Sequence, residues 1–259
     1  MKIFVCIKQV PATSEVAVDE ETGVLQRSGV ASKMNPFDLF ALETALRLKE
    51  AGGGSVTVGT MGPPQARDII QEAFMMGADE GYLFSDRRLA GADVLATSYT
   101  LSQAIRSLGD YDLILCGKQT TDGDTAQVGP AIAEHLNIPH ASWVSALDLA
   151  ENGVQAEQQL QDTVQTAFLP FPCLITVEQD IHVPRLPSMR LKKETRDREI
   201  PVLDLSYFMD QNEAHYGLAG SPTQVERIFP PRRDLEHELI TEGDLAQALY
   251  DRLRAWKIV

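Results

Sequence analysis

Strand-like and helix-like patterns alternate through the first 140 residues, and this alternation restricts the chain to one class of fold. Short runs rich in β-branched and other apolar residues occur at 3–7, 55–60, 81–84 and 112–116. Segments with apolar residues at helical spacing separate these runs. The order predicts an α/β fold with an open, mainly parallel sheet, helices on both faces and right-handed crossovers.

Four helices are predicted from capping residues and apolar spacing. We expect the first to begin with Asn35 as N-cap and Pro36 at the first helical position, and to end at Gly52 in the left-handed conformation. The second follows Pro64 with Ile69, Ile70, Ala73 and Phe74 on its inner face, the third spans 94–108, and the fourth has Val128, Ile132 and Leu136 on its inner face.

The pattern changes after residue 140. Asn152-Gly153 is typical of a hairpin turn between two polar strands, and 173–177 is typical of a buried strand. After about Arg190 the rhythm is lost, up to a terminal helix over about 242–256. Residues 190–259 hold 11 basic and 13 acidic residues, against 12 and 24 in residues 1–189, and few obvious core positions. We therefore expect a domain over 1–190 and a C-terminal arm over 191–259, which packs on another protein or, alternatively, on its own domain.

Composition disfavours several classes of function. The chain has 37 acidic and 23 basic residues and a formal net charge of −14, which would repel the phosphates of a nucleic acid. No apolar run approaches the roughly 18 residues of a membrane span, so we expect no membrane insertion. Three widely separated cysteines without a C-x-x-C pair, and an N-terminus that enters a strand directly, fit a cytoplasmic location. His135 and His140 lack a third ligand, so we expect surface or capping roles and no metal site.

The most informative segment joins the strand at 112–116 to the fourth helix. It contains, in order, Gly117, Lys118, Gln119, Thr120, Thr121, Asp122, Gly123, Asp124, Thr125, Ala126, Gln127, Val128, Gly129 and Pro130. Ligands of open α/β sheets bind beyond the carboxyl ends of the strands. Gly123 and Gly129 would let a ligand approach the backbone, and Thr125 and the first helical amides would donate to a phosphate. Asp122 and Asp124 would suit ribose hydroxyls, a cap or orientation of the loop. The alternative is an ordinary capped strand-to-helix turn.

Three other segments should end near the same edge of the sheet. They are Cys6-Ile7-Lys8 after the first strand, Asn35-Pro36-Phe37-Asp38 at the first helix, and Thr60-Met61-Gly62 after the second strand. Together with the 117–130 loop they outline a nucleotide site. No G-x-G-x-x-G follows a strand and no P-loop is present, which disfavours a dinucleotide fingerprint and a nucleotide hydrolase. Cys6 and Cys116 are predicted to be small buried hydrophobes unless a flavin lies beside them.

Several spaced motifs, in the right order, identify a family. They are V-C-I-K-Q-V-P at 5–11, M-N-P-F-D at 34–38, M-G-P at 61–63, M-M-G-A-D at 75–79, the 117–130 loop and P-C-L-I-T at 172–176. With these motifs the chain resembles the β subunit of electron-transfer flavoproteins over essentially its whole length. The resemblance implies a nucleotide-binding α/β core, a C-terminal arm that wraps around an α subunit, and a redox FAD held mainly by that α subunit.

The resemblance also implies the cofactor of this subunit. Ordinary β subunits hold AMP and electron-bifurcating ones hold a second FAD, and the loop at 122–130 is similar to the bifurcating version. Nucleotide contacts then fall on Cys6, 35–38, Met61 and 122–133. In that scheme NAD(H) is a transient donor: NADH reduces the β-subunit FAD, and the electrons pass to ferredoxin or flavodoxin and, through the α-subunit FAD, to a dehydrogenase. The flavin performs the redox chemistry, so no catalytic side chain is expected. The alternative is an ordinary β subunit with structural AMP.

The partner-recognition loop of the family falls on 184–193, and its protruding apolar residue aligns on Met189. Arg185 and Arg190 flank this position and are predicted to take part in docking. The segment 190–198 holds five basic and two acidic residues. It is either a docking loop for an acidic partner or a solvated, salt-bridged turn. The loop departs from the commoner lysine-rich form, which leaves the identity of the dehydrogenase open.

Overall fold

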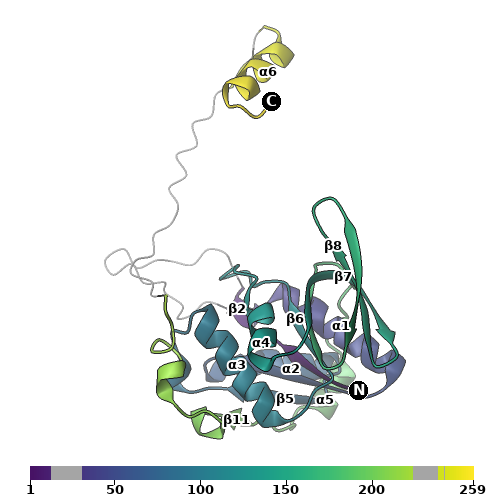
Figure 1. The fold of residues 1–259 in the computed structure, drawn as a ribbon, viewed down its shortest axis with the longest axis vertical. Coiled ribbons are helices and arrows are strands. Elements are labelled where there is room, and N and C mark those ends of the chain that lie inside the picture. Colours follow the sequence, from purple (N-terminus) through teal and green to yellow (C-terminus); the bar gives the residue numbers. More distant parts are fainter. Residues whose placement is uncertain (13–30, 224–238, 242) are drawn as a thin grey trace.

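A central sheet of nine strands organises the part of the chain that the structure describes (Figure 1). The computed structural model describes residues 1–12, 31–223, 239–241 and 243–259. The strands of the sheet are β1 (Lys2–Cys6), β4 (Ser55–Met61), β5 (Glu80–Phe84), β6 (Leu113–Gly117), β7 (His140–Ala150), β8 (Gly153–Gln159), β9 (Val164–Pro170), β10 (Cys173–Val177) and β11 (Val202–Leu203). Their order is β11-β5-β4-β1-β6-β10-β7-β8-β9. Every neighbouring pair from β11 to β7 is parallel, and only β7–β8 and β8–β9 are antiparallel. The predicted open, mainly parallel α/β sheet is confirmed.

The remaining elements surround this sheet or follow it in the chain. The helices are α1 (Pro36–Gly52), α2 (Arg67–Met76), α3 (Val94–Leu108), α4 (Val128–Leu136), α5 (Met189–Glu194) and α6 (Leu245–Ala255). The described residues also form four short 3-10 helices: η1 (Pro64–Ala66), η2 (Arg87–Leu89), η3 (Leu205–Tyr207) and η4 (Glu213–His215). Strand β2 (Gln9–Pro11) pairs with β3 (Ser32–Met34) in a small antiparallel sheet. Within the described residues, no helix combines the length and apolar character that a membrane span requires.

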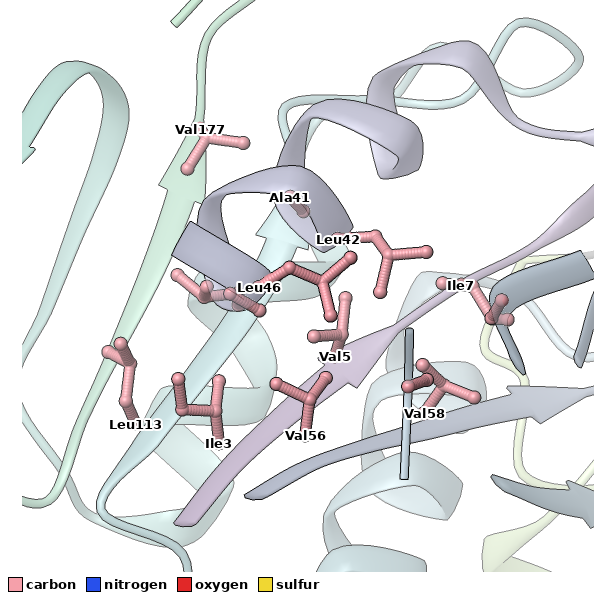
Figure 2. Packing of buried hydrophobic residues seen from close by; sticks show 14 of the residues in the cluster. Ile3, Val5, Ile7, Ala41, Leu42, Leu46, Val56, Val58, Leu113 and Val177 are labelled. Carbon is pink, nitrogen blue, oxygen red and sulfur yellow. The ribbon is translucent and has the colours of Figure 1, made fainter. Parts of the chain in front are cut away.

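Helices cover both faces of the sheet because successive residues of each buried strand point to opposite sides. Ile3 and Val5 of β1 pack in one cluster with Leu42 and Leu46 of α1 (Figure 2). Phe4, between them, belongs to a second cluster with residues of α3 and α4. Each such buried side chain contributes about 1.5–3 kcal/mol relative to an exposed one. The two clusters therefore hold α1 and α2 on one face and α3 and α4 on the other.

Most predicted helices are confirmed, with corrections at the ends of α1. Helix α1 begins at Pro36 and α3 spans 94–108, as predicted. However, α1 continues through Gly52, and the residue with positive φ is Gly53, at 72°. The side chain of Asn35 makes no capping hydrogen bond to its own helix. This side chain instead bonds the loop after β6, as described below.

The inner faces of α2 and α4 are largely as predicted. The predicted inner-face residues of α2 are all buried, together with Met76. In α4, Ile132 is buried with Gly129 and Ala133, whereas Val128 and Leu136 are only half-buried against the same cluster. The short helix leaves its two ends nearer to solvent than its middle.

The hairpin and the buried strand after residue 140 are confirmed, and one strand is additional. Glu151 and Asn152 turn the chain between β7 and β8, with Asn152 at a φ of 60°. All five residues of β10 are buried. Strand β9 was not predicted, because its pairing with β8 buries only one of its seven residues and leaves little apolar alternation in the sequence. Figure 1 shows the antiparallel part of the sheet, where β7 and β8 are labelled, projecting beyond the parallel part.

The expectation of few core positions after residue 190 is wrong for residues 200–221. Strand β11 extends the sheet beside β5, and Ile200, Leu205, Phe208 and Tyr216 are buried. These residues are isolated in irregular chain, where no periodicity marks them as core. They lie on the chain's own domain, in line with the alternative stated above. Helix α6 has no buried residue, so the packing of the later part of the arm stays a prediction.

Candidate functional site

The strand order places a topological switch point between β1 and β6. From β1 the chain proceeds through β4 to β5 on one side, and β6 and β10 lie on the other side of β1. Helix α1 covers one face and α3 the other. In open α/β sheets the crevice beyond the carboxyl ends of the strands at such a point is where ligands bind. The predicted segments after β1 and β6 flank this point.

The end of β1 is fastened to the start of α1. The Lys8 amide donates to Asp38 Oδ2 at 2.8 Å, and the Asn35 amide donates to the Lys8 carbonyl, also at 2.8 Å. A β-carbon on Gly117 would lie 2.5 Å from Asp38 Oδ1 and 2.6 Å from the carbonyl carbon of Phe37. The absence of a side chain at Gly117 therefore allows α1 to begin directly against the end of β6.

Two side chains then join these segments to the loop after β6. Asn35 Nδ2 donates to the Gln119 carbonyl at 2.8 Å, and Asn35 Oδ1 accepts from the Thr121 amide at 3.3 Å. Lys8 Nζ lies 2.7 Å from Asp122 Oδ1 and 2.9 Å from Oδ2. Asp122 thus orients the loop, one of the roles left open for it. The segments at 6–8, 35–38 and 117–122 form one connected cluster.

Asp38 is the buried charge of this cluster. Burial raises the pKa of the Asp38 carboxyl to about 7, although hydrogen bonds from Asn35 and from the Lys8 and Gly117 amides act in the opposite direction. The Lys8 ammonium is paired with Asp122 and so compensates Asp38 only in part. Asp38 consequently titrates near neutral pH in the folded protein.

The loop itself adopts an unusual backbone conformation. Asp124 and Ala126 have φ values of 53° and 55°, in the left-handed region that costs a residue with a side chain about 1–3 kcal/mol. The Asp124 amide donates to the Thr120 carbonyl at 3.0 Å. Most side chains from Thr121 to Gln127 are exposed. Helix α4 follows at once without a side-chain cap, so its first amides are available to a ligand.

The two glycines of this loop have different roles. A β-carbon on Gly123 would meet only Thr120 Oγ1, at 3.4 Å, so space is open beside this residue. A β-carbon on Gly129 would lie 2.5 Å from Thr176 Cγ2. Glycine at 129 is needed because α4 packs closely on β10; the predicted approach of a ligand to its backbone is not tested by this packing. A contact of Gly129 with the cofactor through its amide stays a prediction.

Thr60, Met61 and Gly62 lie at the same edge but outside the connected cluster. Thr60 and Met61 end β4 and Gly62 follows it, and β4 pairs with β1 so that Cys6 faces Gly59. The Gly62 amide donates to the Phe84 carbonyl at 3.1 Å, which directs the turn toward β5. Thr60 is buried, and its Oγ1 has no hydrogen-bond partner among the described residues. This hydroxyl is the one orphaned buried polar group beside the site in the described structure.

Two thiols lie beneath the cluster. Cys6 and Cys116 are register partners on β1 and β6. A hydrogen bond with Cys6, together with burial, raises the pKa of the Cys116 thiol well above its usual value. Cys116 is buried as predicted, whereas Cys6 is only half-buried. Cys116 is therefore not an activated nucleophile in this arrangement.

The predicted docking residues lie elsewhere, on the face covered by α1 and α2. Met189 is 68% exposed at the start of α5. Arg190 is exposed and pairs with Glu194 one turn further, at 3.1 Å. The guanidinium of Arg185 is bonded within the chain, to Glu43 and Glu50 of α1. Residues 190–194 are helical. The salt bridge between Arg190 and Glu194 fits the second alternative stated for this segment, a solvated, salt-bridged turn.

A comparison with protein families bears on this arrangement. The family model described as the electron transfer flavoprotein domain matches residues 22–206. The chain belongs to the electron transfer flavoprotein family. Its similarity to β subunits of this family extends over nearly the whole chain. The electron transfer flavoprotein subunit beta of Megasphaera elsdenii is 44% identical over 98% of the chain and 96% of the relative.

Two other relatives have more specific names. Protein FixA of Azorhizobium caulinodans is 41% identical over 89% of the chain and 85% of the relative. Subunit CarD of the caffeyl-CoA reductase-Etf complex of Acetobacterium woodii is 40% identical over the full length of both chains. The resemblance stated from the motifs is confirmed, and the chain is an electron transfer flavoprotein β subunit.

Several contacts of this electron transfer flavoprotein subunit were not foreseen from its sequence. Lys8 pairs with Asp122, Arg185 with Glu43, and Lys118 with Glu178. Each partner stands far away in the chain, so no local pattern indicates the pairing. Within the described residues, no group of three or more acidic, histidine or cysteine side chains is placed to hold a metal ion. The geometry is that of a binding edge with a buried carboxyl.

Proposed function

We propose that this subunit binds FAD beyond the carboxyl ends of β1 and β6. The observation that carries the proposal is the connected cluster at the switch point, which holds the loop before α4 in place through Asn35, Lys8 and Asp122. A loop fixed in this way presents its backbone amides to a phosphate without further ordering on binding. The contacts of the other predicted cofactor residues remain part of the proposal.

The residues present fit a dinucleotide better than a mononucleotide. The uncapped start of α4 offers amides to a pyrophosphate, and the open space beside Gly123 leaves room for the group that extends beyond it. The orphaned Thr60 hydroxyl offers a hydrogen bond on the β4 side of the edge. AMP, with one phosphate, would use only part of this surface.

The proposed role is that of a β subunit in an electron-bifurcating flavoprotein. A bound flavin supplies acceptance of a hydride from NADH and delivery of single electrons to ferredoxin or flavodoxin and to an α-subunit FAD. This chain binds and orients the flavin, and no described side chain is assigned as a general acid or base. CarD is named as a subunit of a reductase-Etf complex, and by similarity we place this chain in a complex with a flavin-dependent dehydrogenase.

A cytoplasmic location fits the free thiols of the three cysteines.

Pairing with an α subunit is proposed for the end of the chain. Helix α6 exposes Leu245, Leu249 and Tyr250, and Trp256 follows it with 67% of its surface exposed. An apolar helix face without buried residues needs a partner. The α subunit implied by the family is the occupant that we propose.

Docking of the dehydrogenase is proposed for residues 184–193, hereafter the docking segment. Two apolar side chains protrude from it, Leu186 with 88% and Met189 with 68% of their surface exposed. Arg190, Lys192 and Lys193 follow them in the chain and add positive charge, although the chain as a whole is acidic. Such a patch fits an acidic surface with an apolar centre.

The FAD proposal is tested on the purified complex of this chain with its α subunit. Gly123→Val places a branched side chain in the open space, and the spacing to Thr120 predicts that the fold tolerates it. We expect two FAD per wild-type complex and one in the variant, counted by flavin absorbance after denaturation. One FAD and one AMP per wild-type complex, even after incubation with excess FAD, would place the protein among ordinary β subunits instead.

A further inference from the structure

Arg185 joins the docking segment to helix α1. Its Nε donates to Glu43 Oε2 at 2.8 Å and one terminal nitrogen donates to Glu43 Oε1 at 3.2 Å. The same guanidinium donates to Glu50 at 2.6 and 3.1 Å. The Arg185 amide also donates to Glu43 Oε2, at 3.0 Å. The side chain is therefore forked between two carboxylates of one helix, a geometry that lysine cannot reproduce.

Glu43 makes this connection specific because it is a buried charge. Its side chain is only 2% exposed. Burial would raise the pKa of Glu43, but hydrogen bonds from Arg185 and Arg47 outweigh it and lower the pKa below its usual value. A buried carboxylate needs such partners, and loss of Arg185 would leave Arg47 alone to compensate it. The docking segment thus cannot leave α1 without exposing or neutralising Glu43.

The connection also fixes where the docking segment lies relative to the nucleotide edge. Glu43 and Glu50 are seven residues apart, two turns along the same face of α1. The first turn of the same helix carries Asp38, which lies in the cluster at the ends of β1 and β6. A second attachment follows Arg185, where the Ser188 amide donates to the Met75 carbonyl of α2 at 2.8 Å. Leu186 lies between the two attachments and Met189 directly after the second.

We propose that Arg185 is a positioning residue, which holds the docking segment against α1 so that Leu186 and Met189 are presented to the dehydrogenase. Arg185 itself is not the contact, because its guanidinium already makes four hydrogen bonds to Glu43 and Glu50. This inference rests on the proposed docking function of the segment and assigns a new role to a residue first predicted to meet the partner directly. Preorganisation of this kind lowers the entropy lost when two surfaces associate.

The test compares Arg185→Lys, Glu50→Gln and the double variant in the full complex with the α subunit. The probe is a flavin-dependent acyl-CoA dehydrogenase that accepts electrons from the wild-type complex. We expect KM for the dehydrogenase to rise about tenfold in Arg185→Lys, with kcat and flavin content unchanged. Glu50→Gln should raise KM in the same direction, and the two effects should not add, because both variants break one connection. The positive charge is retained in Arg185→Lys, so loss of net charge does not explain the effect.

Hydrogen exchange of residues 184–193 separates this inference from the docking function. Faster exchange in Arg185→Lys is expected, and unchanged exchange would overturn the positioning role. Faster exchange with unchanged KM would show that the segment is held by Arg185 but does not dock the dehydrogenase. Arg88→Lys is the matched control, since Arg88 is forked between Asp86 and Glu213 away from the docking segment. It should leave KM and the exchange of residues 184–193 unchanged.

Discussion

Lys8 Nζ lies 2.7 Å from Asp122 Oδ1, although 114 positions separate the two residues in the chain. Both side chains are partly exposed, so the ion pair contributes only about 0–1 kcal/mol to stability. Its effect is on position: it closes the gap between the end of β1 and the loop that precedes α4. The pair forms only because β1 and β6 are neighbours in the sheet.

Replacement of Lys8 should therefore affect binding more than stability. In Lys8→Ala we expect the affinity for FAD to fall about tenfold, because the loop is no longer held before binding. The melting temperature should change little. Lys2→Ala is the matched control, since Lys2 is an exposed lysine at the opposite end of the same strand. Equal affinity of the two variants, measured by fluorescence titration of the flavin, would contradict the prediction.

Asp38 should make stability depend on pH in a defined direction. Its pKa is about 7 in the folded protein, against an ordinary value of 3.8, so the folded protein holds more protons than the unfolded chain between these values. The contribution of Asp38 to the free energy of unfolding must then fall as pH rises from about 4 to about 7, and stay level above. The change is on the order of a few kcal/mol.

Urea unfolding at pH 5 and pH 8 tests this behaviour. Asp38→Asn cannot titrate, so the loss of stability between the two pH values should be smaller than in the wild type. The two proteins are compared by how much the free energy of unfolding changes with pH and not by its absolute value. The absolute value also changes because the Asn side chain faces the Lys8 and Gly117 amides with one acceptor fewer. An identical slope in both proteins would exclude Asp38 as the titrating group.

Gly117 should tolerate no side chain. In Gly117→Ala the new β-carbon would overlap Asp38 Oδ1 and the backbone of α1, at 2.5 to 2.8 Å. Backbone cannot rotate away as a side chain does, so we expect a loss of about 1–3 kcal/mol in chemical unfolding. Gly123→Ala is the control, because its β-carbon would have only an ordinary contact at 3.4 Å. Equal stability of the two variants would refute the close packing of α1 on β6.

Removal of residues 224–259 should separate folding from assembly. The buried residues of the arm, from Ile200 to Ser221, are retained in this truncation, and no residue of α6 is buried. We expect a soluble protein of nearly unchanged melting temperature that no longer copurifies with the α subunit. Truncation after Arg190 should instead destabilise the domain, since it removes Phe208 and Tyr216 from the core. If the chain that lacks residues 224–259 still copurified with the α subunit, the α-subunit interface would have to lie elsewhere.

Met189 should matter for electron delivery and not for cofactor binding. It is exposed and has no part in the core, so Met189→Ala should leave stability and flavin content unchanged. If it anchors the dehydrogenase, electron transfer at limiting dehydrogenase should slow about tenfold, as expected for a central apolar contact. Met209→Ala removes a similarly exposed methionine outside the docking segment and serves as the control. Equal rates in the two variants would argue against docking at Met189.

Local patterns in the sequence were sufficient for most of the architecture and for the place of the candidate site. The apolar patterns at 3–7 and 94–108 indicate burial of one strand and of one helix face, because each pattern is repeated over several residues of the run. Because ligands bind at the carboxyl ends of parallel strands, the order of strands and loops also predicted which segments lie together. The motifs at 34–38 and 117–130 then indicated the family, which the comparisons confirmed.

Only the tertiary structure decided what individual side chains do. Asn35 bonds the loop after β6 and does not cap its own helix, Gly129 makes room for Thr176, and Arg185 turns inward to Glu43. Phe208 and Tyr216 enter the core from irregular chain. Each of these facts depends on a partner more than 30 positions away, at a distance set by how strands and helices pack. A periodic pattern records which face of an element is buried, whereas a single contact between distant residues leaves no period in the sequence.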